Sequence, residues 1–231
     1  MSGLIGMHDG NKLAVCMPAL DFVSTWFAYD LAGLYAHMAS KGYEISRLVA
    51  SGTYLFEQRE ALAAAVVKGG YFAALWLDTD MRFPKDAFVK LLARELAVVG
   101  AGYPSRHYPH RPVVARNLKT DERVWTTPQH EGCEEVAGIG FGCLLTTGEA
   151  LARVDQPRFT AGWNPDEGRH VTEDMFFCHK LAQAGVPVHV DHDLTKEVAH
   201  LGHVEYTYKT SLQVRDAEEF ADQPLIVAPG A

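Results

Sequence analysis

The stretch YFAALWLDTD, residues 71–80, is an apolar run that ends in two carboxylates one residue apart. An apolar run bounded by polar residues predicts a buried strand, here from Tyr71 to Leu77. Open α/β sheets bind their ligands at the carboxyl ends of their strands, which is where Asp78 and Asp80 fall. Two acids there favour a divalent cation, and a cation there favours a phosphate-bearing substrate. The alternative is that the pair only caps the helix that follows.

The composition indicates one folded domain. The chain has 231 residues, of which 48% are hydrophobic and 22% charged, as is typical of a soluble globular protein. We expect a single domain over residues 1–216 and a C-terminal tail over residues 217–231. No apolar run reaches the roughly 18 residues that cross a bilayer. Residues 1–11 lack the basic-then-apolar order of a signal peptide, so we expect a cytoplasmic protein with no membrane partner.

The cysteines and the charge exclude two classes of function. None of the four cysteines forms a CxxC pair, so a cysteine-based zinc site is not expected. Cys16, Cys143 and Cys178 lie in apolar stretches, which predicts buried free thiols. The net charge of -8 argues against a protein that coats nucleic acid non-specifically. Residues 101–120 nevertheless contain three arginines, one lysine and no acid, which leaves room for a local basic surface.

Strand and helix patterns alternate along the first 101 residues. Pro18 is expected to close the first strand, Asp21 to cap the first helix, and Gly69-Gly70 to end the second helix. Alternating strands and helices predict an α/β fold with a mostly parallel sheet and right-handed crossovers. Strands are expected at residues 12–17, 43–50, 71–77, 96–101, 136–146 and 186–190, and helices at 22–40, 55–68, 85–94, 148–154 and 172–184.

Two acids open the helix expected at residues 172–184. Glu173 and Asp174 precede a fully apolar segment, Met175 to Cys178. Acids in a first turn complement the helix dipole, which explains the pair without any function. One of the two is also expected to share the side of the apolar face, where a carboxylate can serve as a general base. Both interpretations stay open.

Histidines are concentrated near the end of the chain, at positions 189, 192, 200 and 203, with Asp191 and Asp193 among them. Imidazole suits Mn²⁺ or Zn²⁺, so a His/Asp metal hydrolase is a rival hypothesis. A set of surface histidines is the third interpretation. The glycines of Gly138 to Gly142 do not fit a dinucleotide-binding fingerprint, and they indicate close approach of the backbone to a ligand or strand.

These motifs, taken in order, resemble the GT-A glycosyltransferases, and most closely the small family 2 enzymes of bacteria and tailed phages. The resemblance covers most of the chain. It is carried by VCMP at residues 15–18, QREA at 58–61, WLDTDMRFP at 76–84, GIGFGCLL at 138–145, TEDMFFC at 172–178 and AHLG at 199–202.

The resemblance implies a GT-A fold and a role for each matching residue. Asp80 would bind Mn²⁺ or Mg²⁺, His200 would be the further ligand, and His203 the substitute for it. Asp174 would be the general base on the acceptor hydroxyl if the reaction inverts, and Glu173 would orient it or bind the acceptor. The donor, a nucleotide-sugar such as a UDP-sugar, would contact Pro18, Ala19, Arg59, Asp78 and Asp80. The acceptor would contact Gly140, Arg106 and Trp163, with Trp163 as a core anchor of its loop being the alternative.

The acceptor is the least determined part. Some phage relatives transfer sugars to hydroxymethylated pyrimidines in DNA, and the acid-free residues 101–120 fit phosphate contacts of that kind. They fit diphosphate binding in the donor site equally well. A His/Asp hydrolase or nucleotidyltransferase on a similar sheet is the alternative function, and a binding module without turnover is a third.

Overall fold

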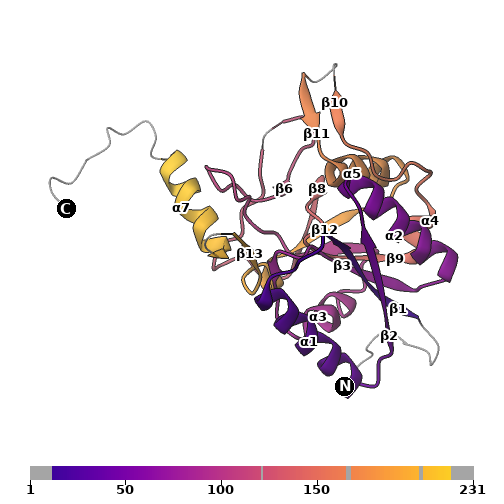
Figure 1. Ribbon diagram of the computed structural model, residues 1–231. Helices are drawn as coiled ribbons and strands as arrows, with labels where there is room; N and C mark the ends of the chain where they lie inside the picture. The colour runs from indigo at the N-terminus through magenta and orange to yellow at the C-terminus, as the bar shows by residue number, and fades with distance from the viewer. Residues whose placement is uncertain (1–11, 121, 165–167, 203–204, 220–231) are drawn as a thin grey trace.

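A computed structural model describes residues 12–120, 122–164, 168–202 and 205–219 (Figure 1). Its centre is a seven-stranded sheet with the order β2-β1-β3-β9-β5-β12-β7. Five of the seven strands run in one direction, and β9 and β7 are antiparallel to their neighbours. The strands are β1 (Leu13–Ala19), β2 (Ile45–Ser51), β3 (Ala73–Leu77), β5 (Val98–Gly100), β7 (Cys133–Val136), β9 (Cys143–Thr147) and β12 (Val188–Asp191).

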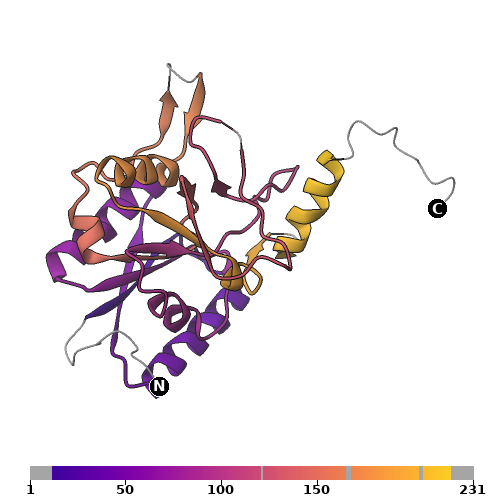
Figure 2. The ribbon, with the colours of Figure 1, turned by 180° about the vertical axis from the view of Figure 1, so that it is seen from behind.

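Helices cover both faces of this sheet (Figures 1 and 2). On the two faces lie α1 (Thr25–Ser40), α2 (Leu55–Gly69), α3 (Ala87–Leu92), α4 (Gly148–Ala152) and α5 (Glu173–Gln183). The short α6 (His192–Thr195) follows β12, and α7 (Tyr208–Glu219) projects away from the sheet (Figure 1). Side chains of α1 and α3 pack with Leu75 and Leu77 in one cluster. Those of α2, α4 and α5 pack with Ala74 and Trp76 in the other. Because side chains alternate along a strand, β3 serves both cores and is buried throughout.

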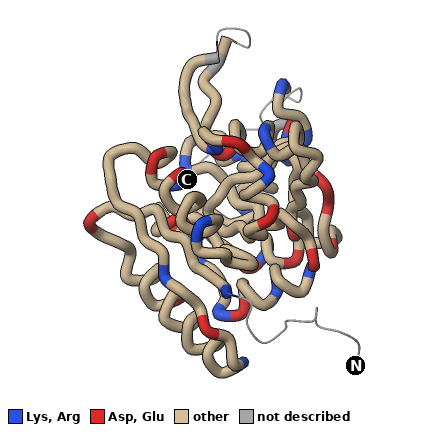
Figure 3. Tube along the Cα trace, turned by 90° about the vertical axis from the view of Figure 1, so that its right-hand side faces the viewer, with Lys and Arg blue, Asp and Glu red and all other residues tan. Residues whose placement is uncertain are grey.

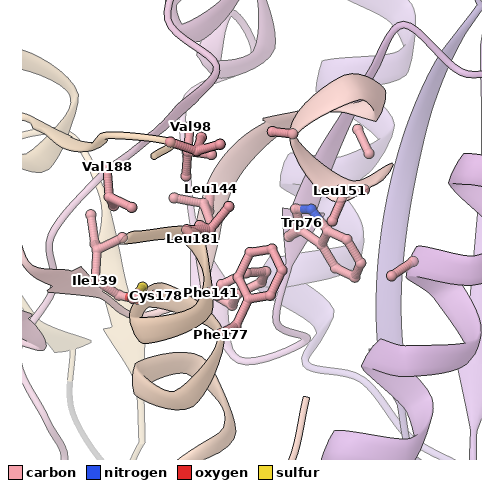
Figure 4. Packing of buried hydrophobic residues seen from close by; sticks show 14 of the residues in the cluster. Trp76, Val98, Ile139, Phe141, Leu144, Leu151, Phe177, Cys178, Leu181 and Val188 are labelled. Carbon is pink, nitrogen blue, oxygen red and sulfur yellow. The ribbon is translucent and has the colours of Figure 1, made fainter. Parts of the chain in front are cut away.

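Aromatic rings fill the core beneath α5 (Figure 4). Phe141 packs edge-on against Trp76 and Phe177, with ring centroids 5.4 Å apart in each case. The indole N–H of Trp76 donates to Thr146 Oγ1 over 2.9 Å. Phe141 thus lies between Trp76 of β3 and Phe177 of α5, and connects the strand that precedes Asp78 to the helix that begins with Glu173.

Short strands surround the main sheet. A three-stranded sheet has the order β14-β13-β4, and a hairpin of β10 and β11 projects at the top of Figure 1. The short strands are β4 (Met81–Arg82), β6 (Val114–Ala115), β8 (Gly138–Ile139), β10 (Gly162–Asn164), β11 (Arg169–Val171), β13 (Ala199–Leu201) and β14 (Glu205–Tyr206). The pairing of β13 with β4 matters for function, because it places His200 opposite Met81, next to Asp80.

Several local expectations were wrong. The first helix begins at Thr25, and Ser24 caps it instead of Asp21, with its Oγ accepting from Trp26 N over 3.2 Å. Pro18 does not close β1, which continues to Ala19 along β2. Pairing with β3 ends at Cys16, and a proline without an N–H is tolerated on such an open edge. The sheet is not wholly parallel at its centre, because the antiparallel β9 lies between β3 and β5.

Other expectations were confirmed. Gly70 ends α2 in the left-handed conformation, with φ of 65°. Cys16, Cys143 and Cys178 are free and buried, and burial raises the pKa of each thiol to about 12. In the described residues, no helix is both long and apolar enough to cross a membrane. Helix α7 extends to Glu219, past the expected start of the tail at Ala217, so the division into domain and tail stays a prediction.

Candidate active site

The acid pair stands at the carboxyl end of β3, as the sequence predicts. Asp78 N–H donates to Gly142 O over 3.1 Å, and Met81 N–H donates to Asp78 O over the same distance. The chain therefore turns between Asp78 and Asp80, and the two carboxylates reach different partners. Each is the centre of a separate cluster.

The first cluster is built on Arg59 of α2, which is 2% exposed. Its Nη2 lies 2.9 Å from Asp78 Oδ1 and 3.0 Å from Oδ2, and its Nη1 lies 2.6 Å from Glu173 Oε1. The guanidinium also lies over the ring of Phe141, 5.0 Å from its centroid. Burial alone would lower the pKa of Arg59, but Asp78 and Glu173 raise it above its ordinary value. The group therefore stays charged and joins the end of β3 to the start of α5.

Arg59 was expected to contact the donor. Its two terminal nitrogens pair with Asp78 and Glu173, so a direct contact between Arg59 and the donor would require one of these ion pairs to break. Its geometry suits a positioning role for Asp78 and Glu173, and the donor contact stays a prediction.

The second cluster joins Asp80 to His200 of β13 and to Arg106. His200 Nε2 lies 3.4 Å and Arg106 Nη1 3.1 Å from Asp80 Oδ2. Leu201 N–H donates to Asp80 O over 2.6 Å, which fixes β13 against the turn. Burial raises the pKa of Asp80, but the hydrogen bond and charge of His200 and the charge of Arg106 bring it below its ordinary value. Arg106, expected at the acceptor, thus lies beside the proposed metal ligand.

The donor set of this cluster suits a divalent cation. His200 Nδ1 lies 3.0 Å from Pro104 O, and since a carbonyl only accepts, Nδ1 carries the proton. With a proton on Nδ1, Nε2 faces Asp80 Oδ2 and either donates a hydrogen bond to it from the charged ring or, in the neutral ring, offers a lone pair that a divalent cation beside Asp80 would take up. Within the described ranges, no three His, Cys, Asp or Glu side chains are grouped to hold an ion. Asp80 and His200 would supply two ligands, with substrate phosphate and water as the others. His203 lies outside the described residues.

Asp174 is the buried acid of the pair that opens α5, with 8% of its surface exposed. Its Oδ1 accepts from Met175 N–H over 2.8 Å and from the hydroxyl of Thr172. It lines a pocket of about 420 Å³. Its burial agrees with the expectation that one of the two acids shares the side of the apolar face, and its role as a general base stays a prediction. Glu173 turns instead to Arg59. Burial raises the pKa of Glu173 above its ordinary value, against the opposing effect of Arg59.

Tyr103 is a site residue that the sequence analysis missed. It is 7% exposed, and its hydroxyl oxygen accepts a hydrogen bond from Gly142 N–H in the glycine-rich segment over 3.0 Å. A Cβ on Gly140 would lie 2.4 Å from Tyr103 Oη, so that glycine is required for the contact. Burial, followed by the charges of Asp78 and Asp174, raises the pKa of Tyr103 well above its ordinary value. Its position after β5, in Gly102-Tyr103-Pro104, was the only signal available.

Residues expected at the donor and the acceptor are distributed around these clusters. Ala19 lines an apolar pocket of about 420 Å³ that reaches Thr79, between the two acids, and Pro18 precedes it in β1. Gly140 is buried under Tyr103, and its acceptor contact stays a prediction. Trp163 is 59% exposed on the β10–β11 hairpin and packs edge-on against His170. This exposure contradicts the alternative of a core anchor.

The late histidines do not gather into one site. His192 is buried, with Nδ1 2.8 Å from Thr126 Oγ1 and Nε2 3.1 Å from Glu134 Oε2. His189 Nδ1 lies 3.4 Å from Val98 O. Asp191 and Asp193 both pair with Arg94. Of the described histidines in this group, His200 alone contacts Asp80, which removes the geometric basis for a His/Asp hydrolase centre there.

Comparison of the sequence finds no matching family model and no matching curated protein. Among solved structures, A197 from STIV has a TM-score of 0.58 and 19% identity, covering 83% of this chain and 86% of that one. GalNAc-T7, solved with UDP, GalNAc and Mn²⁺, has a TM-score of 0.49 and 12% identity, covering 90% of this chain and 48% of that one. A glycosyltransferase involved in the glycosylation of the major capsid of PBCV-1 has a TM-score of 0.32 and 13% identity, covering 64% of this chain and 68% of that one.

The fold is α/β. The likeness to A197 concerns the fold alone, at 19% identity. The predicted α/β fold, with its mostly parallel central sheet flanked by helices, was confirmed, and the assignment to the GT-A superfamily stays a prediction. Because one fold can support many functions, the function is argued from the residues of the site.

Proposed function

We propose that this chain is a metal-dependent glycosyltransferase that moves a sugar from a nucleotide-diphosphate sugar to an acceptor hydroxyl. The observation that carries the proposal is the pair of Asp80 Oδ2 and His200 Nε2, 3.4 Å apart at the end of β3. Asp78, two residues before Asp80 in the chain, is held by the buried guanidinium of Arg59. The proposal is supported by the position of these carboxylates at the carboxyl end of a strand, where open α/β sheets bind nucleotides.

The donor half would use the carboxyl ends of β1 and β3. The nucleoside of a UDP-sugar would lie along Pro18 and Ala19 toward Asp78, with the diphosphate at Asp80 and His200. A divalent cation, Mn²⁺ or Mg²⁺, would neutralise the charge that develops on the diphosphate as it leaves. Arg59 would keep Asp78 in place, because the guanidinium holds both of its oxygens.

The acceptor half would use Asp174. As the acceptor oxygen forms its bond to the anomeric carbon, its proton passes to Asp174, the sugar–phosphate C–O bond breaks, and that electron pair leaves with the diphosphate. This role belongs to an inverting reaction. Glu173, held by Arg59, would fix the first turn of α5, and Trp163 would offer an exposed ring for stacking on a sugar or base.

The proposal extends to a hydroxymethylated pyrimidine in DNA as acceptor. Residues 101–120 contain no acid, which suits contact with phosphates. Two of their arginines already have carboxylate partners, Arg106 with Asp80 and Arg116 with Glu122 and Glu134. Mobility of the protein on duplex DNA with and without hydroxymethylated bases tests the extension. An absence of binding at low salt, where electrostatic attraction is strongest, would refute it.

Identifying which bond of the nucleotide-sugar is broken tests the proposed transferase activity. Incubation with UDP-sugars and Mn²⁺ should release UDP together with a glycosylated product or free sugar. Asp80→Asn should abolish this release, and the matched control Asp155→Asn, at an exposed position in the described part of the chain, should not. Cleavage inside the diphosphate, giving UMP or pyrophosphate, would favour the hydrolase or nucleotidyltransferase alternative.

A further inference from the structure

A second pocket lies beside the clusters at the end of β3. It has a volume of about 420 Å³, within the range of roughly 300–1,000 Å³ that ligand pockets occupy. The loop from Ser105 to Val113 forms one wall, and β11 and the first turn of α5 form the other. We call it the α5 pocket. Ser105 stands between Pro104, which holds His200, and Arg106, which holds Asp80, so one loop borders both this pocket and the metal cluster.

The described lining of the α5 pocket is rich in basic side chains. Arg111, Arg123, His107 and His170 line it, and Asp174 is the acid among the lining residues that the structure describes. The chain as a whole has the opposite balance, with 29 acids against 21 lysines and arginines. Figure 3 shows the two signs interspersed over the trace. Among the described residues, this pocket therefore has more basic than acidic groups in its lining, in contrast to the chain as a whole.

The arginines do not need to be unpartnered to favour an anion. Both Arg111 and Arg123 have interactions within the chain. A guanidinium carries five N–H donors in a planar fork, so it binds a phosphate alongside another partner. The N-terminal turn of α5, an 11-residue helix, adds its partial positive charge at the same wall.

Asp174 is placed to act on a group held in this pocket. In the described residues, both bonds that its carboxylate accepts go to Oδ1, from Met175 N–H and the Thr172 hydroxyl. The residue lines the pocket, and Oδ2 keeps its accepting capacity for a ligand bound there. A carboxylate among basic groups would repel an anion that touched it directly, so the anionic group belongs at the arginines and a neutral hydroxyl at Oδ2.

We propose that the α5 pocket binds a phosphate group of the acceptor, with Arg111 and Arg123 as its main contacts, and thereby holds the acceptor hydroxyl at Asp174. This inference rests on the proposed transferase function, of which it names the acceptor class. The phosphate has two sources, a phosphodiester of nucleic acid or a phosphomonoester of a small alcohol. The experiment distinguishes the two sources by using one probe for each.

The test measures binding of two probes to the full chain in EDTA, so that no metal draws phosphate to Asp80. The probes are a fluorescent thymidine tetranucleotide, for the phosphodiester, and glycerol 3-phosphate, for the phosphomonoester. Wild type should bind one of them, and Arg111→Gln combined with Arg123→Gln should weaken that binding roughly tenfold or more. Arg153→Gln, at an exposed arginine of the α4 end outside the pocket, should not change it.

Two further measurements keep the outcomes separate. If the double variant fails to fold by circular dichroism, the single Arg123→Lys and Arg111→Lys variants replace it, and both should weaken binding, because lysine lacks the guanidinium fork. Binding of UDP with Mn²⁺ should be unchanged in every variant that folds. If UDP binds but neither probe binds wild type, or if the variants bind the probe as tightly as wild type, this inference alone is overturned. If wild type does not bind UDP with Mn²⁺, the proposed function is overturned. The binding of the phosphate probes measured in EDTA then still reports on the α5 pocket.

Discussion

Arg59 Nη1 lies 2.6 Å from Glu173 Oε1, although the two residues are 114 positions apart in the chain. The same guanidinium holds Asp78, so one buried cation connects the acid at the end of β3 with the acid that opens α5. The donor half and the acceptor half of the proposed site are therefore fixed relative to each other by a single side chain.

The first prediction concerns this ion pair. Arg59→Met should lower the free energy of unfolding by about 3 kcal/mol, because it leaves two largely buried carboxylates without their cation. Urea denaturation measures the change. Arg153→Gln, at an exposed arginine, should stay within about 0.5 kcal/mol of wild type. A loss below about 1 kcal/mol for Arg59→Met would show that the acids find other partners.

The second prediction concerns the glycine under Tyr103. Gly140→Ala should destabilise the fold by about 1–3 kcal/mol, because its Cβ would lie 2.4 Å from Tyr103 Oη. Gly162→Ala is the matched control, since nothing lies within 4 Å of a Cβ there. Thermal unfolding of both variants compares them. Equal stability of the two would mean that Tyr103 moves away without cost.

The third prediction concerns buried His192 and pH. Burial lowers the pKa of His192 below its ordinary 6.5, against the opposing effect of Glu134. The unfolded chain therefore binds this proton more readily, and folding stability should fall as the pH drops from about 6.5 through the lower folded pKa. His192→Gln should flatten urea-measured stability over that window, and His179→Gln, on an exposed part of α5, should not. A wild-type profile with no slope there would contradict the assignment.

The fourth prediction concerns Asp174. Asp174→Asn should slow sugar transfer by roughly 10²–10⁴-fold, the usual contribution of a general base, while the affinity for UDP and Mn²⁺ stays unchanged. Initial rates of UDP release, measured beside binding by calorimetry, separate the two effects. A parallel loss of UDP affinity would place Asp174 in the donor half instead.

Local patterns in the sequence predicted the elements and the first acids well. The apolar run of β3 and its two carboxylates are adjacent in the chain, and Gly70 has the special conformation that ends α2. Helix and strand periodicity therefore located β3, α2 and α5 to within a few residues.

Long-range pairing lay beyond those patterns. The insertion of β9 between β3 and β5 depends on strand pairing across about 70 residues, which periodicity does not encode. His200 reaches Asp80 because β13 pairs with β4, while His189 and His192, nearby in sequence, turn to Val98 and Glu134. Tyr103 was missed because its contacts are with Gly140 and Gly142, which follow it by 37 and 39 positions in the chain.

Isothermal titration of UDP, with Mn²⁺ and with EDTA, tests the central claim most directly. Wild type should bind UDP more tightly with Mn²⁺, and Asp80→Asn should lose roughly 10–100-fold in that metal-dependent affinity, with Asp155→Asn unchanged. Equal affinity of wild type for UDP with Mn²⁺ and with EDTA, or an unchanged affinity in Asp80→Asn, would contradict the account.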